Sequence, residues 1–308
     1  MKVTLDLTRL RAEGRITAEE HDRLLALSAK EGASLAINIL IGFGVAAVSL
    51  AALALVPDPR AALALGGLML AGGTGLLARL AAWRVLGAIL VLVGALLFGG
   101  GLVVLQEGSA ASFLTVTAVF AVAALLSGNG LLAVLAVFGL SGALDARAGY
   151  SHAVYSIAIP EPAATVLVFS ALAFGLYRLS KHLPPAGERL ALIGARTALF
   201  LVNLGFWVGS LWGDETQSGM RESFGRSIPA EAFVIGWALA LLAVGAWAVR
   251  ENRRWVLNLA AIFGGIHFYT QWFERLGATP LSLLAAGLVL LAIAFGLWRW
   301  NERFSREN

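Results

Sequence analysis

The feature that most constrains the fold of this chain is a series of apolar segments, each close to the length of a membrane-spanning helix. A helix needs about 20 apolar residues to cross the hydrocarbon core of a bilayer. The chain of 308 residues is 59% hydrophobic and 14% charged, whereas soluble domains are about half apolar and a quarter charged. We therefore predict an all-α polytopic transmembrane bundle of about ten spans. The predicted spans cover residues 34–56, 61–79, 84–106, 110–127, 130–146, 162–179, 190–212, 229–249, 255–273 and 280–298.

The fourth and fifth predicted spans are the shortest of the series. Only the uncharged sequence SGNG, at residues 127–130, separates them. A tight hairpin of two short segments is therefore the alternative to two full crossings. Both arrangements leave an even number of spans in the chain.

The basic residues predict the orientation of these spans. With the N-terminus placed in the cytoplasm, all but five of the 23 lysines and arginines fall on the cytoplasmic side. Cytoplasmic loops carry an excess of lysine and arginine, so the bias predicts that both termini are cytoplasmic. We expect a multi-pass membrane protein. The five exceptions are Arg60, Arg147, Arg221, Arg226 and Arg275.

The N-terminal region is charged and predicts a short helical hairpin. Leu5, Leu7 and Leu10 precede Gly14, a residue type that commonly ends helices. The sequence TAEE at residues 17–20 has the spacing of a capping box, which begins the next helix. The predicted organisation is a cytoplasmic hairpin at 1–32, a transmembrane bundle at 33–299 and a cytoplasmic tail at 300–308.

A hairpin of this size has too small a core to fold alone. One interpretation is a structural cap that continues into the first span. The other is a docking module at residues 1–32 for a cytoplasmic protein partner.

Glycine-rich stretches recur within the predicted spans. Examples are GGLMLAGGTG at residues 66–75, GALLFGGG at 94–101 and GFWVG at 205–209. Small residues allow neighbouring helices to approach closely in a membrane. We expect packing within the chain, and the alternative use of the last stretch is the contact face of a homo-oligomer.

The two ends of the chain resemble a bacterial family of predicted membrane proteins, known as domain of unknown function 2157 and related to family 4401. The resemblance rests on RLRAEGRITAEEHDRLL at residues 9–25 and on the last two spans at residues 258–303. The middle of the chain is similar only in hydropathy. The resemblance implies the architecture described above, a place in the bacterial inner membrane as a multi-pass protein, and no assigned activity.

Polar residues in the ninth predicted span mark the candidate site. His267, Gln271 and Glu274 recur at the spacing of one helix face. Because polar groups facing lipid are costly, this face is expected to point into the bundle. Asn203 and Trp207 on the seventh span have matching spacing.

Together, these residues predict an outward-facing polar and aromatic cleft that binds a ligand. The residues predicted to bind it are His267, Gln271, Glu274, Asn203, Trp207, Tyr269 and Trp272. The alternative is interhelical hydrogen bonding, with Tyr269 and Trp272 in an interfacial aromatic belt.

Several functional classes lack support in the sequence. The chain has no cysteine, which excludes disulfides and thiol chemistry. It carries no GxSxG, Walker or HExxH motif, and we predict no catalytic residues, cofactor, metal or nucleic-acid partner. Asp145, His152, Glu161 and Asp214 could in principle meet as a metal site, but they have no recognisable metal-ligand spacing.

The preferred hypothesis is a non-enzymatic membrane protein that transports or handles a small ligand or lipid, with membrane lipid as its partner. The first alternative is a membrane scaffold or accessory subunit that docks a cytoplasmic protein. A weaker alternative is an enzyme acting on a lipid headgroup, with His267 as base and Glu274 orienting it.

Overall fold

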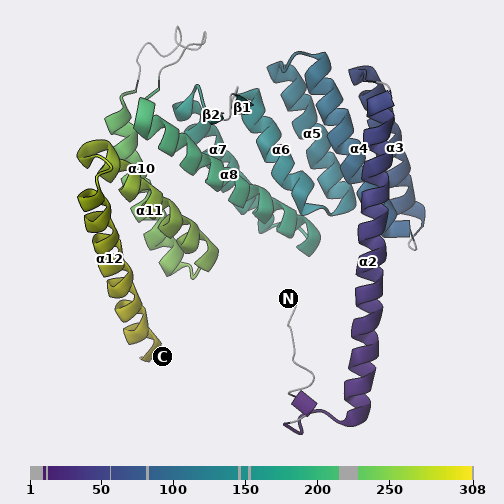
Figure 1. Ribbon diagram of the computed structural model, residues 1–308, viewed down its shortest axis with the longest axis horizontal. Coiled ribbons are helices and arrows are strands. Elements are labelled where there is room, and N and C mark those ends of the chain that lie inside the picture. The colour runs from purple at the N-terminus through teal and green to yellow at the C-terminus, as the bar shows by residue number, and fades with distance from the viewer. Residues whose placement is uncertain are drawn as a thin grey trace. The chain divides into compact units, whose positions relative to one another are not determined.

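The structure is a computed structural model that describes residues 10–11, 13–55, 57–80, 83–144, 147–151, 154–214 and 228–306. These residues are helical apart from turns and one two-stranded hairpin (Figure 1). The helices are α2 (Ala18–Leu55), α3 (Pro59–Arg79), α4 (Arg84–Leu105), α5 (Ala110–Ser127), α6 (Gly130–Ala143), α7 (Pro162–Ser180), α8 (Pro185–Trp212), α10 (Ala230–Arg250), α11 (Arg254–Leu276) and α12 (Pro280–Arg306). The strands are β1 (Arg147–Ser151) and β2 (Val154–Ala158).

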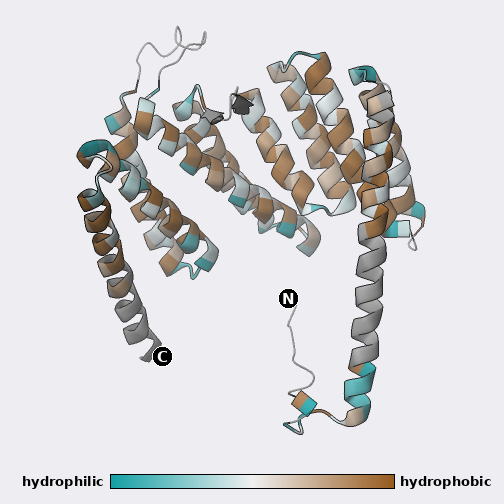
Figure 2. Ribbon diagram, in the orientation of Figure 1, coloured by the Kyte–Doolittle hydropathy of each residue, from teal (hydrophilic) through white to brown (hydrophobic). Residues whose placement is uncertain are grey.

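Six of the described helices are long and apolar enough to cross a membrane: α3, α4, α5, α7, α8 and α10. Figure 2 shows hydrophobic residues along these helices and polar residues gathered at their ends. Large apolar side chains are exposed, including Leu68 at 72%, Leu125 at 66% and Leu242 at 71%. Soluble monomers rarely expose so much apolar surface, whereas lipid accepts it. The structure therefore confirms that the chain is mainly helical and that it has apolar helices long enough to span a membrane.

The other predicted spans also fall on helices, but their crossing stays a prediction. Helix α6 has only 14 residues, and the apolar part of α12 covers Pro280–Ala292. In α2 the apolar part covers Leu40–Ala51. The polar residues of α11 lower its hydropathy below that of the six.

The N-terminal capping box is confirmed. The Thr17 amide donates to Glu20 Oε2 at 2.9 Å, and the Glu20 amide donates to Thr17 Oγ1 at 3.2 Å. Gly14, with φ of +69°, makes the turn before it. Residues 1–9 and 12 lie outside the described residues, so the first helix of the predicted hairpin is not tested.

Helix α2 runs without a break through the predicted boundary between hairpin and first span. Its 38 residues correspond to a length of about 57 Å. A bilayer core is only about 30 Å thick, so a charged N-terminal part of the same helix extends beyond one crossing. At the other end of the chain, α12 continues to Arg306, through most of the predicted tail.

The chain divides into two compact units, residues 1–136 and 137–308. In the first unit, α3 and α4 pack through glycines whose missing side chains leave room for backbone. A Cβ on Gly73 would lie 2.8 Å from the Gly87 carbonyl oxygen, and one on Gly94 would lie 2.8 Å from the Leu70 nitrogen. The glycine stretches of these spans therefore pack within the chain, as the sequence predicts.

In the second unit, the glycines of GFWVG also have partners within the chain. A Cβ on Gly205 would lie 3.1 Å from Thr165 Cγ2 on α7, and one on Gly209 would meet the Phe233 ring on α10 at 2.5 Å. This face of α8 is already occupied by two neighbouring helices. These glycines therefore give no support to a homo-oligomer, which stays a prediction.

The segment before α7 differs from the all-α prediction. Strands β1 and β2 pair antiparallel, with Arg147 opposite Ala158 and Ser151 opposite Val154. Aromatic and β-branched residues alternate with small ones here, a composition that favours strands. His152 lies outside the described residues.

Candidate functional site

The candidate site lies in the second unit, where α8 packs against α7, α10 and α11. The α7–α8 contact is formed by fully buried apolar side chains, among them Phe169 and Ala198, each at 0% exposure. This core fixes the rotation of α8. The opposite face of α8 then presents its polar residues to α10 and α11.

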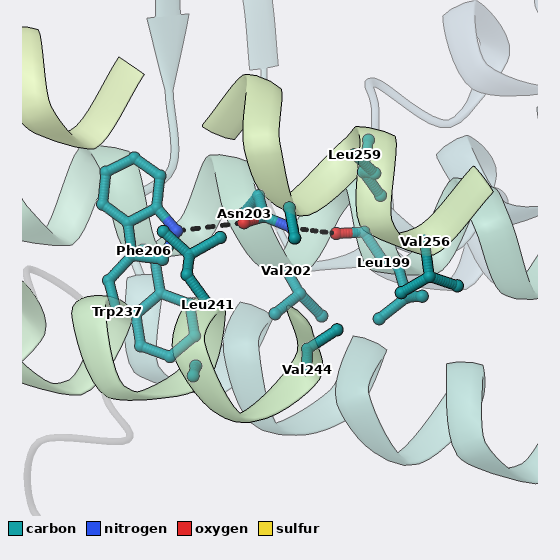
Figure 3. Close-up of a pocket in the computed structure, with 11 residues that line it drawn as sticks. Leu199, Val202, Asn203, Phe206, Trp237, Leu241, Val244, Val256 and Leu259 are labelled. Atoms are coloured by element: carbon teal, nitrogen blue, oxygen red, sulfur yellow. Dashed lines mark hydrogen bonds between the residues drawn. The ribbon is translucent and has the colours of Figure 1, made fainter. Parts of the chain in front are cut away.

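The central interaction joins Trp237 of α10 to Asn203 of α8 (Figure 3). The Trp237 indole N–H donates to Asn203 Oδ1 at 2.9 Å, and Asn203 Nδ2 donates to the Leu199 carbonyl oxygen at 2.8 Å. The Trp237 side chain is fully buried. A buried tryptophan usually finds a partner for its N–H, and Asn203 supplies that partner while satisfying its own amide.

The ring of His267, on α11, packs edge-on against the Trp237 ring. The two ring centroids lie 4.9 Å apart with an interplanar angle of 74°. Phe263 lies one turn earlier on α11. Its ring centroid is 6.4 Å from that of Trp237 and 5.7 Å from that of Phe200. The structure thus brings His267 and Asn203 to the same tryptophan.

A second interhelical bond lies further along the same helices. The Trp207 indole N–H donates to Thr270 Oγ1 at 3.0 Å. Gln271, the neighbour of Thr270, lies partly buried on α11. We use the term seam for the polar and aromatic residues shared by α8, α10 and α11, which are Asn203, Trp207, Trp237, His267, Thr270 and Gln271.

The remaining predicted residues lie beyond the seam. The Trp272 indole N–H donates to the Ser282 carbonyl oxygen of α12 at 3.1 Å. Tyr269 stacks on Phe273 with ring centroids 5.6 Å apart. Glu274 is exposed at the end of α11. Of these three residues, Trp272 connects α11 to α12.

Two buried nitrogen atoms of the seam have no hydrogen-bond partner among the described residues: His267 Nδ1 and Gln271 Nε2. A buried polar atom without a partner costs about 1–3 kcal/mol. Because His267 Nδ1 has no partner, it makes no hydrogen bond to Glu274. Pairing with Glu274 would then have to use His267 Nε2, so the enzyme hypothesis stays a prediction.

A small cavity adjoins the seam. It has a volume of about 40 Å³ and lies between α8, α10 and α11, lined by Asn203, Trp237 and apolar residues such as Val244 and Val256 (Figure 3). A water molecule occupies about 30 Å³ in the liquid, so the cavity has room for water and is much smaller than a typical ligand pocket of about 300 Å³ or more. The cavity lies on the side of the Trp237–Asn203 bond nearer the α10–α11 turn.

Sequence reasoning missed Trp237, Phe263 and Thr270. One signal was available for Trp237, which lies seven residues into an apolar helix, about 10 Å from its start. A tryptophan at that depth is beyond the interfacial belt and needs a partner for its N–H. Phe263 and Thr270 carry no such signal.

Residues considered for a metal site are only partly described. Asp145 and His152 lie outside the described residues, while Glu161 and Asp214 lie at the start of α7 and the end of α8. The described residues contain no group of three potential metal ligands.

Burial raises the pKa of the Asp214 carboxyl above its ordinary value, although a hydrogen bond from the Ala163 backbone lowers it in part. Its Oδ1 is buried without a partner among the described residues. A raised pKa means that folding favours the protonated form. Its contribution to stability is therefore fully present below the pKa of an unfolded aspartate, and it is lost as pH rises through the higher folded value.

We predict that Asp214→Asn reduces the loss of stability with rising pH, because asparagine stays neutral and can still accept from Ala163. Thermal unfolding in detergent between acidic and neutral pH measures this. Parallel profiles of the variant and the wild-type chain would contradict the prediction.

No protein-family model matches the chain, and no similar curated protein or solved structure was found.

Proposed function

We propose that the chain is a membrane protein that handles a small ligand or lipid at the seam, and that it is not an enzyme. The observation that carries this proposal is the pair of buried, unpartnered nitrogens on His267 and Gln271. They stand beside two indole N–H groups that do have partners. A ligand with acceptor groups would satisfy Gln271 Nε2, and it would also satisfy His267 Nδ1 in the tautomer that carries the proton on this nitrogen.

The proposed setting is the bacterial inner membrane, with both termini in the cytoplasm and about ten spans. The distribution of basic residues supports it. In this orientation the end of α11 that carries Glu274 faces outward, so ligand would enter the seam from that end. Membership of the family known as domain of unknown function 2157 is proposed on the similarity of the two chain ends.

Water access to the seam tests this proposal. Single cysteines are introduced at positions 267 and 271 of the cysteine-free chain. A water-soluble cationic methanethiosulfonate is then added outside intact cells. We expect both positions to be modified, because a thiolate reacts only where water reaches it. Ile262→Cys, on the same helix and 62% exposed toward the proposed lipid, is the matched control and should resist.

Purified His267→Leu gives a second readout. It should elute as the wild type does from size exclusion and lose any compound that native mass spectrometry finds on the wild-type protein. Cysteines at 267 and 271 that resist modification as fully as position 262 would show a closed seam with a packing role only.

One observation favours a scaffold as the second candidate function. Helix α2 is longer than one crossing requires, and its first turn is acidic, with Glu19 and Glu20. A charged helical extension is a surface that a cytoplasmic protein can bind. Deletion of residues 1–25 should then remove a specific partner from pull-downs while the bundle stays monodisperse.

A further inference from the structure

The ends of α7 and α10 carry a cluster of basic and aromatic residues that the seam does not use. Lys181 Nζ lies 4.9 Å from the centroid of the Tyr177 ring, and Arg253 Cζ lies 5.8 Å from the same centroid. The Trp247 ring meets Tyr177 edge-on at 5.8 Å. We call Tyr177, Lys181, Trp247 and Arg253 the basic cluster.

The backbone fixes the position of both cations. Lys181 caps the C-terminus of α7, where its amide donates to the Arg178 carbonyl oxygen. Arg253 belongs to the tight α10–α11 turn, in which its amide donates to the Ala248 carbonyl oxygen at 2.8 Å and Asn252 has φ of +51°. The cluster is therefore assembled from two rigid helix ends.

The basic cluster has no internal counterion. In the described part of the chain, neither Lys181 nor Arg253 forms a salt bridge. The aromatic ring attracts each cation, but two cations near one ring also repel each other. An anion placed between them would remove that repulsion.

The location of the cluster identifies the anion. Helices α7 and α10 are both long and apolar enough to span a membrane, and tyrosine and tryptophan near helix ends mark the headgroup level. Apolar side chains beside the cluster are exposed, with Leu179 at 49% and Val249 at 53%. A phosphate at Lys181 and Arg253 would thus have its acyl chains along these residues.

We propose that the basic cluster binds the headgroup of an anionic phospholipid. Lys181 and Arg253 bind the phosphate, Tyr177 and Trp247 pack beside the glycerol region, and the acyl chains lie along the exposed apolar surface of α7 and α10. Basic sites between helices at the membrane surface recognise anionic headgroups in this way. This site lies at the opposite end of α10 and α11 from the proposed ligand entrance and does not depend on it.

The test uses the full chain in detergent, titrated with phosphatidylglycerol or phosphatidylcholine and read by native mass spectrometry. We expect the wild type to prefer phosphatidylglycerol. The double variant Lys181→Gln/Arg253→Gln should lose that preference by about tenfold or more, since each cation near the membrane surface contributes to binding an anionic lipid.

The matched control is Arg250→Gln/Arg254→Gln, which removes two positive charges beside Arg253, at residues with no cation–π contact to Tyr177 in the described part of the chain. It should retain most of the preference. If the two double variants lose the preference for phosphatidylglycerol equally, the binding is general electrostatic attraction and the proposal is overturned. An unchanged preference in Lys181→Gln/Arg253→Gln would also overturn it. Displacement of phosphatidylglycerol by an equal concentration of glycerol 3-phosphate would show a site for free phosphate instead. Monodisperse elution of each variant confirms that it is folded.

Discussion

Replacing Trp237 by alanine is expected to destabilise the chain by about 3–5 kcal/mol, the usual cost of removing a fully buried aromatic side chain. Trp237 has 0% exposure and holds α10 against α8 and α11 through Asn203 and His267. Its loss would enlarge the existing cavity and leave Asn203 Oδ1 without its donor. Unfolding of the purified protein in mixed micelles with increasing denaturing detergent measures the effect.

Two variants separate the contributions of the ring and its N–H. Trp237→Phe keeps most of the ring and should lower the free energy of unfolding by about 1 kcal/mol. Combined with Asn203→Leu in a double-mutant cycle, it should show a coupling near 0.6 kcal/mol, the average for interhelical bonds in membranes. Leu239→Ala, at a side chain 61% exposed on the same helix, is the control. A Trp237→Ala variant as stable as Leu239→Ala would contradict the packing described for the seam.

The second large effect is expected at Gly73 on α3. An added Cβ would lie 2.8 Å from the Gly87 carbonyl oxygen and from the Val91 nitrogen. Both are backbone atoms of α4 that cannot turn aside, so the helices must separate. Overpacking of this kind costs about 1–3 kcal/mol, and Gly73→Val should cost more than Gly73→Ala.

Gly72 provides the matched control, because an added Cβ there meets nothing within 4 Å. Gly72→Ala should stabilise the helix by up to about 1 kcal/mol, the difference in helix propensity between alanine and glycine. The same detergent titration compares the two alanine variants. Similar stabilities for Gly72→Ala and Gly73→Ala would refute close packing of α3 on α4.

The sequence predicted helix positions well because bilayer length and hydropathy are local properties. It also predicted the capping box at Thr17 and Glu20, whose hydrogen bonds form within one turn. The continuity of α2 agrees with the interpretation of the N-terminal region as a cap that continues into the first span, although Gly32 at the predicted boundary is a residue type that commonly ends helices. The β-hairpin was missed because ten residues of paired strand give a weak signal between strongly apolar spans.

The candidate site was predicted only in part. The expectation that His267 and Gln271 point into the bundle followed from the cost of facing lipid. Their partners depend on which helices are neighbours and on how each helix is rotated about its axis. Successive residues of a helix point in directions about 100° apart, so adjacent residues face different neighbours. Trp207 thus bonds to Thr270 rather than to the adjacent Gln271, and Trp237 of α10 takes the position next to Asn203.

The orientation of the chain in the membrane determines the side from which ligand would enter the seam and the side on which the basic cluster lies. Single cysteines test it directly in the cysteine-free chain. Two positions, 28 on α2 and 186 in the first turn of α8, are expected in the cytoplasm. Two others, 278 between α11 and α12 and 218, which lies outside the described residues, are expected outside.

An impermeant maleimide added to intact cells should label cysteines at Ser218 and Ala278 and spare those at Ser28 and Ala186 until the membrane is opened. Labelling of the cysteines at positions 28 and 186, with no labelling of those at positions 218 and 278, would contradict the predicted orientation.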